Sequence, residues 1–218
     1  MKEITIKAYE VTELSDKAKE KAYYKWLEHH EYFWSSENEA SLRAFEDIFP
    51  IKISGWSYGG QGSYVSWDMH TDHDIDELSG QRLATYLWNN YRNVIFQRKY
   101  LKSFRKSNRI KHPMVVQKQE ADKKTGEVYF WTTVYSNMKT DTYNCPLTGY
   151  IIDNSLLDPI WKFMEKPDNT TFYNLVDACL DSWLKDCNDD YEYCTSMEYF
   201  VEDMESNGIM FDESGRII

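Results

Sequence analysis

Residues 51–69 read IKISGWSYGGQGSYVSWDM and carry the clearest hairpin pattern in the chain. Apolar and aromatic residues alternate with polar ones on both sides of the turn at 59–62, which is typical of two β-strands. Glycine at positions 59, 60 and 62 permits the positive φ angles that a tight connection needs. This stretch therefore predicts a β-hairpin around which the other elements pack.

The hairpin is also a candidate ligand site. Aromatic rings stack on planar bases, and glycine amides can bind a phosphate. The hairpin residues that could serve in this way are Trp56, Tyr58, Gly59, Gly60, Gln61, Tyr64 and Trp67. Aromatic residues make up 16% of the chain, and they are at least as typical of a hydrophobic core as of a binding surface. The sequence leaves both interpretations open.

Charge is distributed unevenly along the 218 residues. Residues 92–111 contain eight Lys or Arg and no Asp or Glu, whereas residues 141–218 contain four Lys or Arg and seventeen Asp or Glu. The basic segment could supply cations to an anionic ligand beside the hairpin. The candidate cations are Arg92, Arg98 and Lys99 of this segment, together with Arg43 from outside it.

The acidic segment offers a different kind of surface. It clusters carboxylates at Asp186, Asp189, Asp190 and Glu192, and such a cluster can imitate a nucleic acid toward a basic protein. A helix face that only contacts solvent would give the same pattern, and this holds for the basic segment too. Because contacts to phosphate require cations, the net charge of −11 predicts no direct binding to DNA.

The remaining pattern predicts several helices around a small antiparallel sheet. The expected helices cover residues 15–33, 36–49, 79–106, 153–164, 171–184 and 190–206. Their expected N-caps include Ser15, Asp153 or Asn154, and Thr170 or Thr171. Besides the hairpin, the expected strands are an N-terminal strand at 2–11, a hairpin at 114–119 and 127–135, and a C-terminal edge strand at 209–218. We therefore expect one α+β domain over residues 1–218, in which residues 153–207 could form a helical subdomain.

A polar turn after the hairpin, HTDHDIDE at 70–77, contains residue types that bind metals. Two histidines three positions apart with scattered aspartates match no defined site, so a solvated loop is the favoured interpretation and no metal or cofactor is predicted. A metal-dependent hydrolase that uses His70, His73 and Asp74 is the least favoured function, since no partner nucleophile is evident.

The cellular setting is indicated by what the sequence contains at its start and at its cysteines. The chain begins Met1-Lys2-Glu3-Ile4 without a signal-peptide pattern, and no run of about 18 apolar residues is present. The cysteines lack the paired spacing of zinc sites. We therefore expect a cytoplasmic protein with free thiols and no membrane segment. Homo-oligomerisation is an open alternative, because many aromatic side chains must be covered.

Three segments resemble a family of small phage and prophage proteins labelled "antitoxin of toxin–antitoxin stability system". The first two are residues 4–28, ITIKAYEVTELSDKAKEKAYYKWLE, and residues 49–60, FPIKISGWSYGG. The third is residues 145–193, from CPLTGY to DDYEY, together with FDESGR at 211–216. The resemblance implies a viral, intracellular and accessory role, and it carries no residue with an assigned chemical role. The stretch 92–144 lies outside it.

Two functions follow from these observations. The first is a phage accessory binding protein that counters host antiviral defence by sequestering a nucleotide-derived signalling molecule without cleaving it. The second is a protein inhibitor, acting as an antitoxin or an acidic nucleic-acid mimic, that blocks a host toxin, nuclease or defence protein in the host cytoplasm. The first requires the basic segment and the hairpin to form one site, and the second requires an exposed acidic surface.

Overall fold

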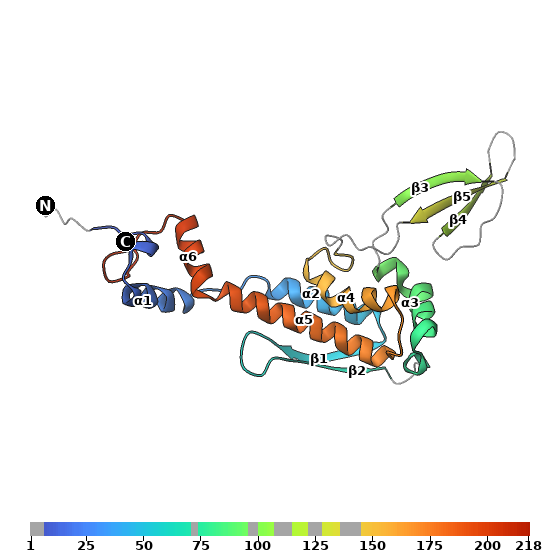
Figure 1. Cartoon of the computed structure of the whole chain (residues 1–218), viewed down its shortest axis with the longest axis horizontal. Helices are drawn as coiled ribbons and strands as arrows, with labels where there is room; N and C mark the ends of the chain where they lie inside the picture. Colours follow the sequence, from blue (N-terminus) through green and yellow to red (C-terminus); the bar gives the residue numbers. More distant parts are fainter. Residues whose placement is uncertain (1–6, 71–73, 96–99, 107–114, 122–127, 136–144) are drawn as a thin grey trace.

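A computed structural model describes residues 7–70, 74–95, 100–106, 115–121, 128–135 and 145–218 (Figure 1). These residues form the predicted α+β fold. Strands β1 (Ile51–Ser57) and β2 (Tyr64–Met69) pair antiparallel, so the hairpin prediction is confirmed. The pairing register shifts between Ile53 and Gly55, which marks a β-bulge.

Three helices pack together and against the hairpin. Helix α2 (Ser35–Ile48) contacts β1, and helix α5 (Phe172–Cys194) contacts β2. Helix α4 (Ile152–Glu165) packs against both α5 and α2. Figure 1 shows the hairpin running alongside α5. The hairpin therefore rests on a helical layer built largely from the second half of the chain.

The main hydrophobic core lies where these elements meet. Its fully buried side chains come from every element around the hairpin, including helix α3 (Gly80–Ile95). They include Leu42, Phe45, Ile51, Ile53, Leu83, Leu87, Leu156, Phe172 and Trp183. Burial of each such side chain stabilises the fold by about 1.5–3 kcal/mol. Cys179 and Cys187 belong to this core, and all four cysteines of the chain are free thiols.

A second, smaller core joins the two ends of the chain. It is formed by the 3-10 turn η1 (Val11–Glu13), helix α1 (Asp16–Leu27), helix α6 (Met197–Ser206) and the segment around Phe211. Tyr9 and Phe211 exchange two backbone hydrogen bonds of 2.9 Å. The predicted terminal strands thus meet as isolated bridges, and residues 2–6 lie outside the described part. Helix α5 spans the distance between the two cores (Figure 1).

Several predicted helix ends are confirmed and others are wrong. Ser15 and Thr171 cap α1 and α5 as expected, although α1 ends at Leu27 rather than near residue 33. The break expected at Asp189 and Asp190 is wrong, since α5 continues to Cys194. Asp189 pairs with Lys185 one turn earlier, which supports the helix there. The next helix begins only after Ser196, whose side chain caps α6.

The long helix expected over residues 79–106 is also wrong in its second half. Helix α3 ends at Ile95, and residues 100–106 form strand β3 (Tyr100–Lys106). The indole N–H of Trp161 donates to the carbonyl oxygen of Ile95 at 2.8 Å, which occupies an acceptor that a longer helix would have used. A helix would also have aligned Arg98, Lys102 and Lys106 four residues apart, and such like charges repel.

Strand β3 belongs to a three-stranded sheet that the sequence predicted only as a hairpin. Strands β4 (Val115–Ala121) and β5 (Val128–Tyr135) pair antiparallel as expected. Strand β3 adds to the other edge of β5, giving the order β3-β5-β4. Figure 1 shows this sheet beyond α3, set apart from the helical layer.

The stability of the fold should depend strongly on which glycine of the hairpin turn is replaced. Gly59 has φ of +80°, and a methyl group there would lie 2.7 Å from the ring of Tyr191. We expect Gly59→Ala to lower the free energy of unfolding by about 2–4 kcal/mol, through backbone strain and overpacking. Gly60 has open space around it, so the control Gly60→Ala should change that free energy by less than about 0.5 kcal/mol. Urea unfolding of both variants measures the difference, and equal losses would show that the turn does not pack on α5.

Candidate functional site

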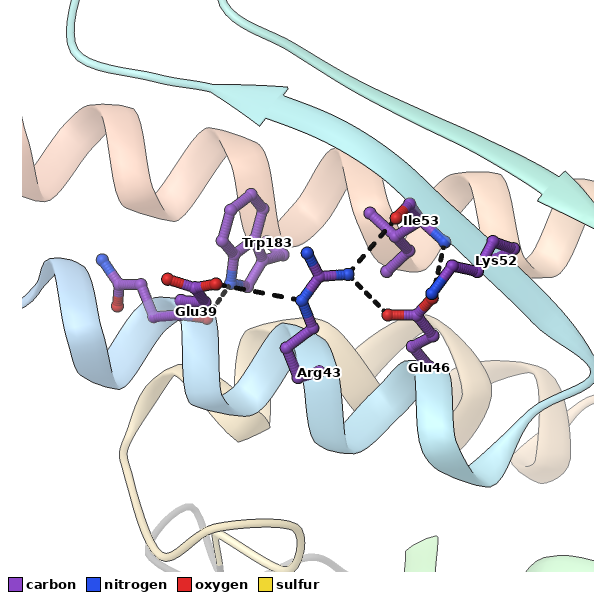
Figure 2. Close-up of polar contacts among 7 residues, drawn as sticks. Glu39, Arg43, Glu46, Lys52, Ile53 and Trp183 are labelled. Carbon is purple, nitrogen blue, oxygen red and sulfur yellow. Dashed lines mark hydrogen bonds and ion pairs between the residues drawn. The ribbon is translucent and has the colours of Figure 1, made fainter.

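The structure brings together Arg43 and Trp56, two of the predicted ligand-binding residues. The Arg43 guanidinium lies 4.5 Å from the centroid of the Trp56 ring. The same guanidinium forms a 2.6 Å ion pair with Glu46 and donates to the carbonyl oxygen of Ile53 at 3.2 Å (Figure 2). Its Nε lies 3.9 Å from Glu39. Arg43 thus joins α2 to β1, and its charge is already compensated within the fold.

Glu46 is the acceptor at the centre of this junction. Its side chain is only 9% exposed, and it accepts from Lys52 at 2.7 Å and from the Ile53 amide at 3.1 Å (Figure 2). Burial raises the pKa of this carboxyl, but hydrogen bonds from Lys52, Arg43 and Ile53 outweigh burial and lower the pKa to about 2. Glu46 is therefore ionised at neutral pH and connects α2 to the first strand.

The glycine turn is bound to α5 rather than open to a ligand. The Gly59 amide, one of the predicted phosphate donors, donates to Oδ1 of Asn188 at 2.8 Å, and Ser63 Oγ donates to the same oxygen at 2.8 Å. Tyr58 is partly buried, with its ring edge-on to Trp183 at 5.7 Å. Gly60 and Gln61 are exposed at the tip of the turn.

The remaining hairpin aromatics do not form an open stacking floor. Trp67 is partly buried, donates its indole N–H to Asp177 at 3.3 Å, and lies 4.5 Å from the ring of Tyr173. Tyr64 is half-exposed and covers Gly55. Trp56, Tyr58 and Trp67 thus pack against the main core, which agrees with the structural interpretation of the aromatic pattern.

The predicted cations do not gather at the hairpin turn in the described part of the chain. Arg92 lies in the last turn of α3 and donates to the carbonyl oxygens of Trp88 and Asn89, at 3.1 and 3.0 Å, in its own helix. Figure 1 places α3 at the end of the hairpin opposite to its turn. Arg98 and Lys99 lie outside the described residues.

A cleft that the sequence did not reveal lies between the start of α2, the start of α4 and the second half of α5. Its volume is about 790 Å³. Among the described residues of its lining, four are acidic, several are apolar and none is Lys or Arg. The described lining residues are Trp34, Glu37, Asn38, Gly149, Tyr150, Ile151, Ile152, Ser155, Asp186, Cys187, Asp189 and Asp190.

One side of the cleft is shaped by Asp153. This carboxylate is fully buried and accepts from the amides of Leu147, Thr148 and Gly149 at 3.0, 2.8 and 3.2 Å. The expectation that Asp153 or Asn154 caps α4 is wrong, because the N-cap is Ile151 and Asp153 instead holds the preceding loop. Thr148 also bonds to Ser41 of α2 at 2.9 Å, so this wall is fixed to two helices.

The acidic lining residues of the cleft form few ion pairs with Lys or Arg of the described residues. Asp186 accepts from Ser155, and Asp190 accepts from Tyr32 at 2.5 Å. Burial and the hydrogen bond to Asp190 raise the pKa of Tyr32, so this tyrosine stays neutral. Only Asp189 pairs with a cation, Lys185, among the acidic lining residues within the described ranges. The lining of the cleft therefore carries net negative charge.

Two large apolar side chains of the cleft lining are exposed to solvent. Trp34 is 48% exposed and Ile151 is 75% exposed, although both are large hydrophobic residues. Tyr150 lies beside Ile151 on the same wall. Carboxylates and exposed apolar side chains in one lining suit a ligand that is both cationic and partly apolar. The sequence showed the clustered aspartates, but no local signal joined them to Trp34 or Ile151.

Within the described ranges, no group of three or more His, Cys, Asp or Glu could hold a metal ion. His73 lies outside those ranges, and the trio with His70 and Asp74 is not placed. No helix among the described residues has both the length and the apolar composition needed to cross a membrane. No protein-family model, curated protein or solved structure matches this chain.

Acid should weaken the junction at Glu46. Because its pKa in the folded state lies below that of the unfolded chain, its stabilisation is present above about pH 4.5 and is lost as the pH falls toward 2. We expect Glu46→Gln to lower the free energy of unfolding at neutral pH by about 1–3 kcal/mol and to flatten its decline in acid.

The matched control is Glu39→Gln, which removes a half-exposed carboxylate 3.9 Å from the same guanidinium. It should change the free energy of unfolding by less than about 0.5 kcal/mol. Urea unfolding at several pH values between 2 and 7 checks both expectations. Equal effects of the two substitutions would contradict a special role for Glu46.

Proposed function

We propose that this protein is an inhibitor that binds a basic segment of a partner protein in the cleft between α2, α4 and α5. The observation that supports this most is the lining of the cleft, where Glu37, Asp186 and Asp190 lie together with exposed apolar side chains and no Lys or Arg of the described residues is present. In the phage setting that the sequence resemblance suggests, the partner is a host toxin, nuclease or defence protein in the host cytoplasm.

The physical argument combines two kinds of contact. A Lys or Arg of the partner can form ion pairs with carboxylates that the fold already holds close together. Binding therefore loses little entropy in ordering these carboxylates. The exposed rings and aliphatic groups of Trp34, Tyr150 and Ile151 can then cover the apolar part of the partner's segment. The negative charge also speeds encounter with a basic partner, and this effect weakens with salt.

Sequestration of a nucleotide has less support from the described residues. Arg43 is compensated by Glu46, Arg92 bonds to its own helix, and the Gly59 amide donates to Asn188. A phosphate in the cleft would face carboxylates and be repelled. Arg98 and Lys99 lie outside the described residues, so the nucleotide hypothesis stays a prediction. No catalytic role is proposed.

The cleft can be tested before the partner is known, with an arginine-rich peptide as the probe in titration calorimetry. We expect the double variant Glu37→Gln/Asp186→Asn to weaken peptide binding at least about tenfold, because two charge contacts are lost. Trp34→Ala should weaken it as well, without changing the dependence on salt. The glutamine and asparagine side chains retain oxygen acceptors, so the fold should be preserved.

The control is Glu165→Gln/Glu205→Gln, which removes the same net charge from exposed positions outside the cleft. It should leave peptide affinity nearly unchanged. The same set of variants then tests partners captured from host lysate. If the two double variants bind the peptide equally, attraction is diffuse and the cleft is not the binding site.

A further inference from the structure

None of the described residues of the basic part of the chain lines the acidic cleft. Residues 92–140 contain twelve Lys or Arg and three Asp or Glu, a formal charge of +9. Since the whole chain has a net charge of −11, the other residues together carry −20. Strands β3, β4 and β5 all belong to the positive segment. The net charge of the whole chain therefore conceals two regions of opposite sign.

The strand register shows which residues of the three strands lie opposite one another. Strand β5 is central, and its Trp131 pairs with Arg105 of β3 on one side and with Lys118 of β4 on the other. Residues of one row across a sheet share a face, as do alternate residues along a strand. Tyr129 and Thr133, and Glu120 of β4, which pairs with Tyr129, therefore belong to the same face as the row of Arg105, Trp131 and Lys118.

The opposite face has a different composition. One of its rows pairs Val115 with Val134, and another pairs Ala121 with Val128. Phe130 of β5 lies on that face too, by alternation along the strand. An antiparallel sheet commonly has one apolar face and one polar face. In this sheet both faces are mixed, because Lys102, Phe104 and Lys106 of β3 lie on the opposite face. Among the described rows, the row of Arg105, Trp131 and Lys118 is the one in which an aromatic residue of the central strand has a cation on each neighbouring strand.

We propose that the β3-β5-β4 sheet binds single-stranded nucleic acid through the face that carries Arg105, Trp131 and Lys118. Unpaired bases stack on aromatic residues whatever their sequence, and cations on either side follow the phosphates. Paired bases of a duplex do not offer their faces for stacking, so the face selects single strands. The charge of −20 on the other residues repels phosphate, which confines binding to the sheet. This site is independent of the cleft.

The test uses the full chain and fluorescence anisotropy of labelled oligo(dT) and oligo(U) of about 20 nucleotides, near 50 mM NaCl. We expect saturable binding, with Trp131→Thr weakening the affinity about tenfold and Trp131→Phe largely restoring it. Arg105→Gln/Lys118→Gln should reduce the slope of log Kd against log salt concentration by about 1.4, since each lost phosphate contact contributes about 0.7. Tighter binding of oligo(U) assigns RNA as the ligand, and tighter binding of oligo(dT) assigns DNA.

The matched control is Lys102→Gln/Lys106→Gln, which removes the same charge from positions of the opposite face of β3. It should weaken binding less than Arg105→Gln/Lys118→Gln. Circular dichroism and thermal unfolding show that each variant folds, and Glu37→Gln/Asp186→Asn should bind oligonucleotides like the wild type.

Four results would overturn the proposal. The first is that neither oligonucleotide binds. The second is that Arg105→Gln/Lys118→Gln and Lys102→Gln/Lys106→Gln weaken oligonucleotide binding equally while Trp131→Thr leaves it unchanged. The third is duplex binding as tight as single-strand binding. The fourth is salt-sensitive self-association in sedimentation velocity that oligonucleotides do not displace, since it would assign the basic sheet to another copy of this chain.

Discussion

Burial of Trp183 fixes the contact among α5, α2 and the hairpin, and the cleft depends on that contact. The ring is fully buried, lies edge-on to Tyr58, and donates its indole N–H to the Asn38 carbonyl oxygen at 3.2 Å. Asn38 and Asp190 both bond to Tyr32, which connects the start of α2 to α5. One large aromatic side chain thus sets the spacing of the two helices that supply the four acidic residues of the described lining.

Charged side chains are paired at the junction of α2 and β1 but largely unpaired in the cleft, among the described residues. At the junction of α2 and β1, Arg43, Glu46 and Lys52 compensate one another inside the fold, and this arrangement stabilises the structure. In the cleft the carboxylates outnumber their cationic partners among the described residues, so compensation is left to a ligand. This contrast is why Arg43, a predicted ligand-binding residue, is better explained as structural, and why we propose that the acidic lining of the cleft binds a partner.

Much of the secondary structure could be predicted because its signals are local. The alternation around Gly59 and the side-chain caps at Ser15 and Thr171 each depend on neighbours within a few residues. Predictions failed where distant contacts decide the outcome. Trp161 donates to the last carbonyl oxygen of α3, and strand β5 pairs with residues 100–106. The prediction for Asp153 failed for a local reason, because this residue binds the loop four to six residues before it instead of capping its helix.

The sequence by itself determined the α+β class, the hairpin with its glycine turn, and the separation of basic and acidic segments, since these follow from residue type and short-range spacing. Only the tertiary structure decided which charges are already paired and where a cleft forms. Trp34, Ile151 and Asp186 are separated by 117 and 35 positions along the chain, and no local pattern links them. They line one cleft because α2, α4 and α5 bury their apolar faces against one another.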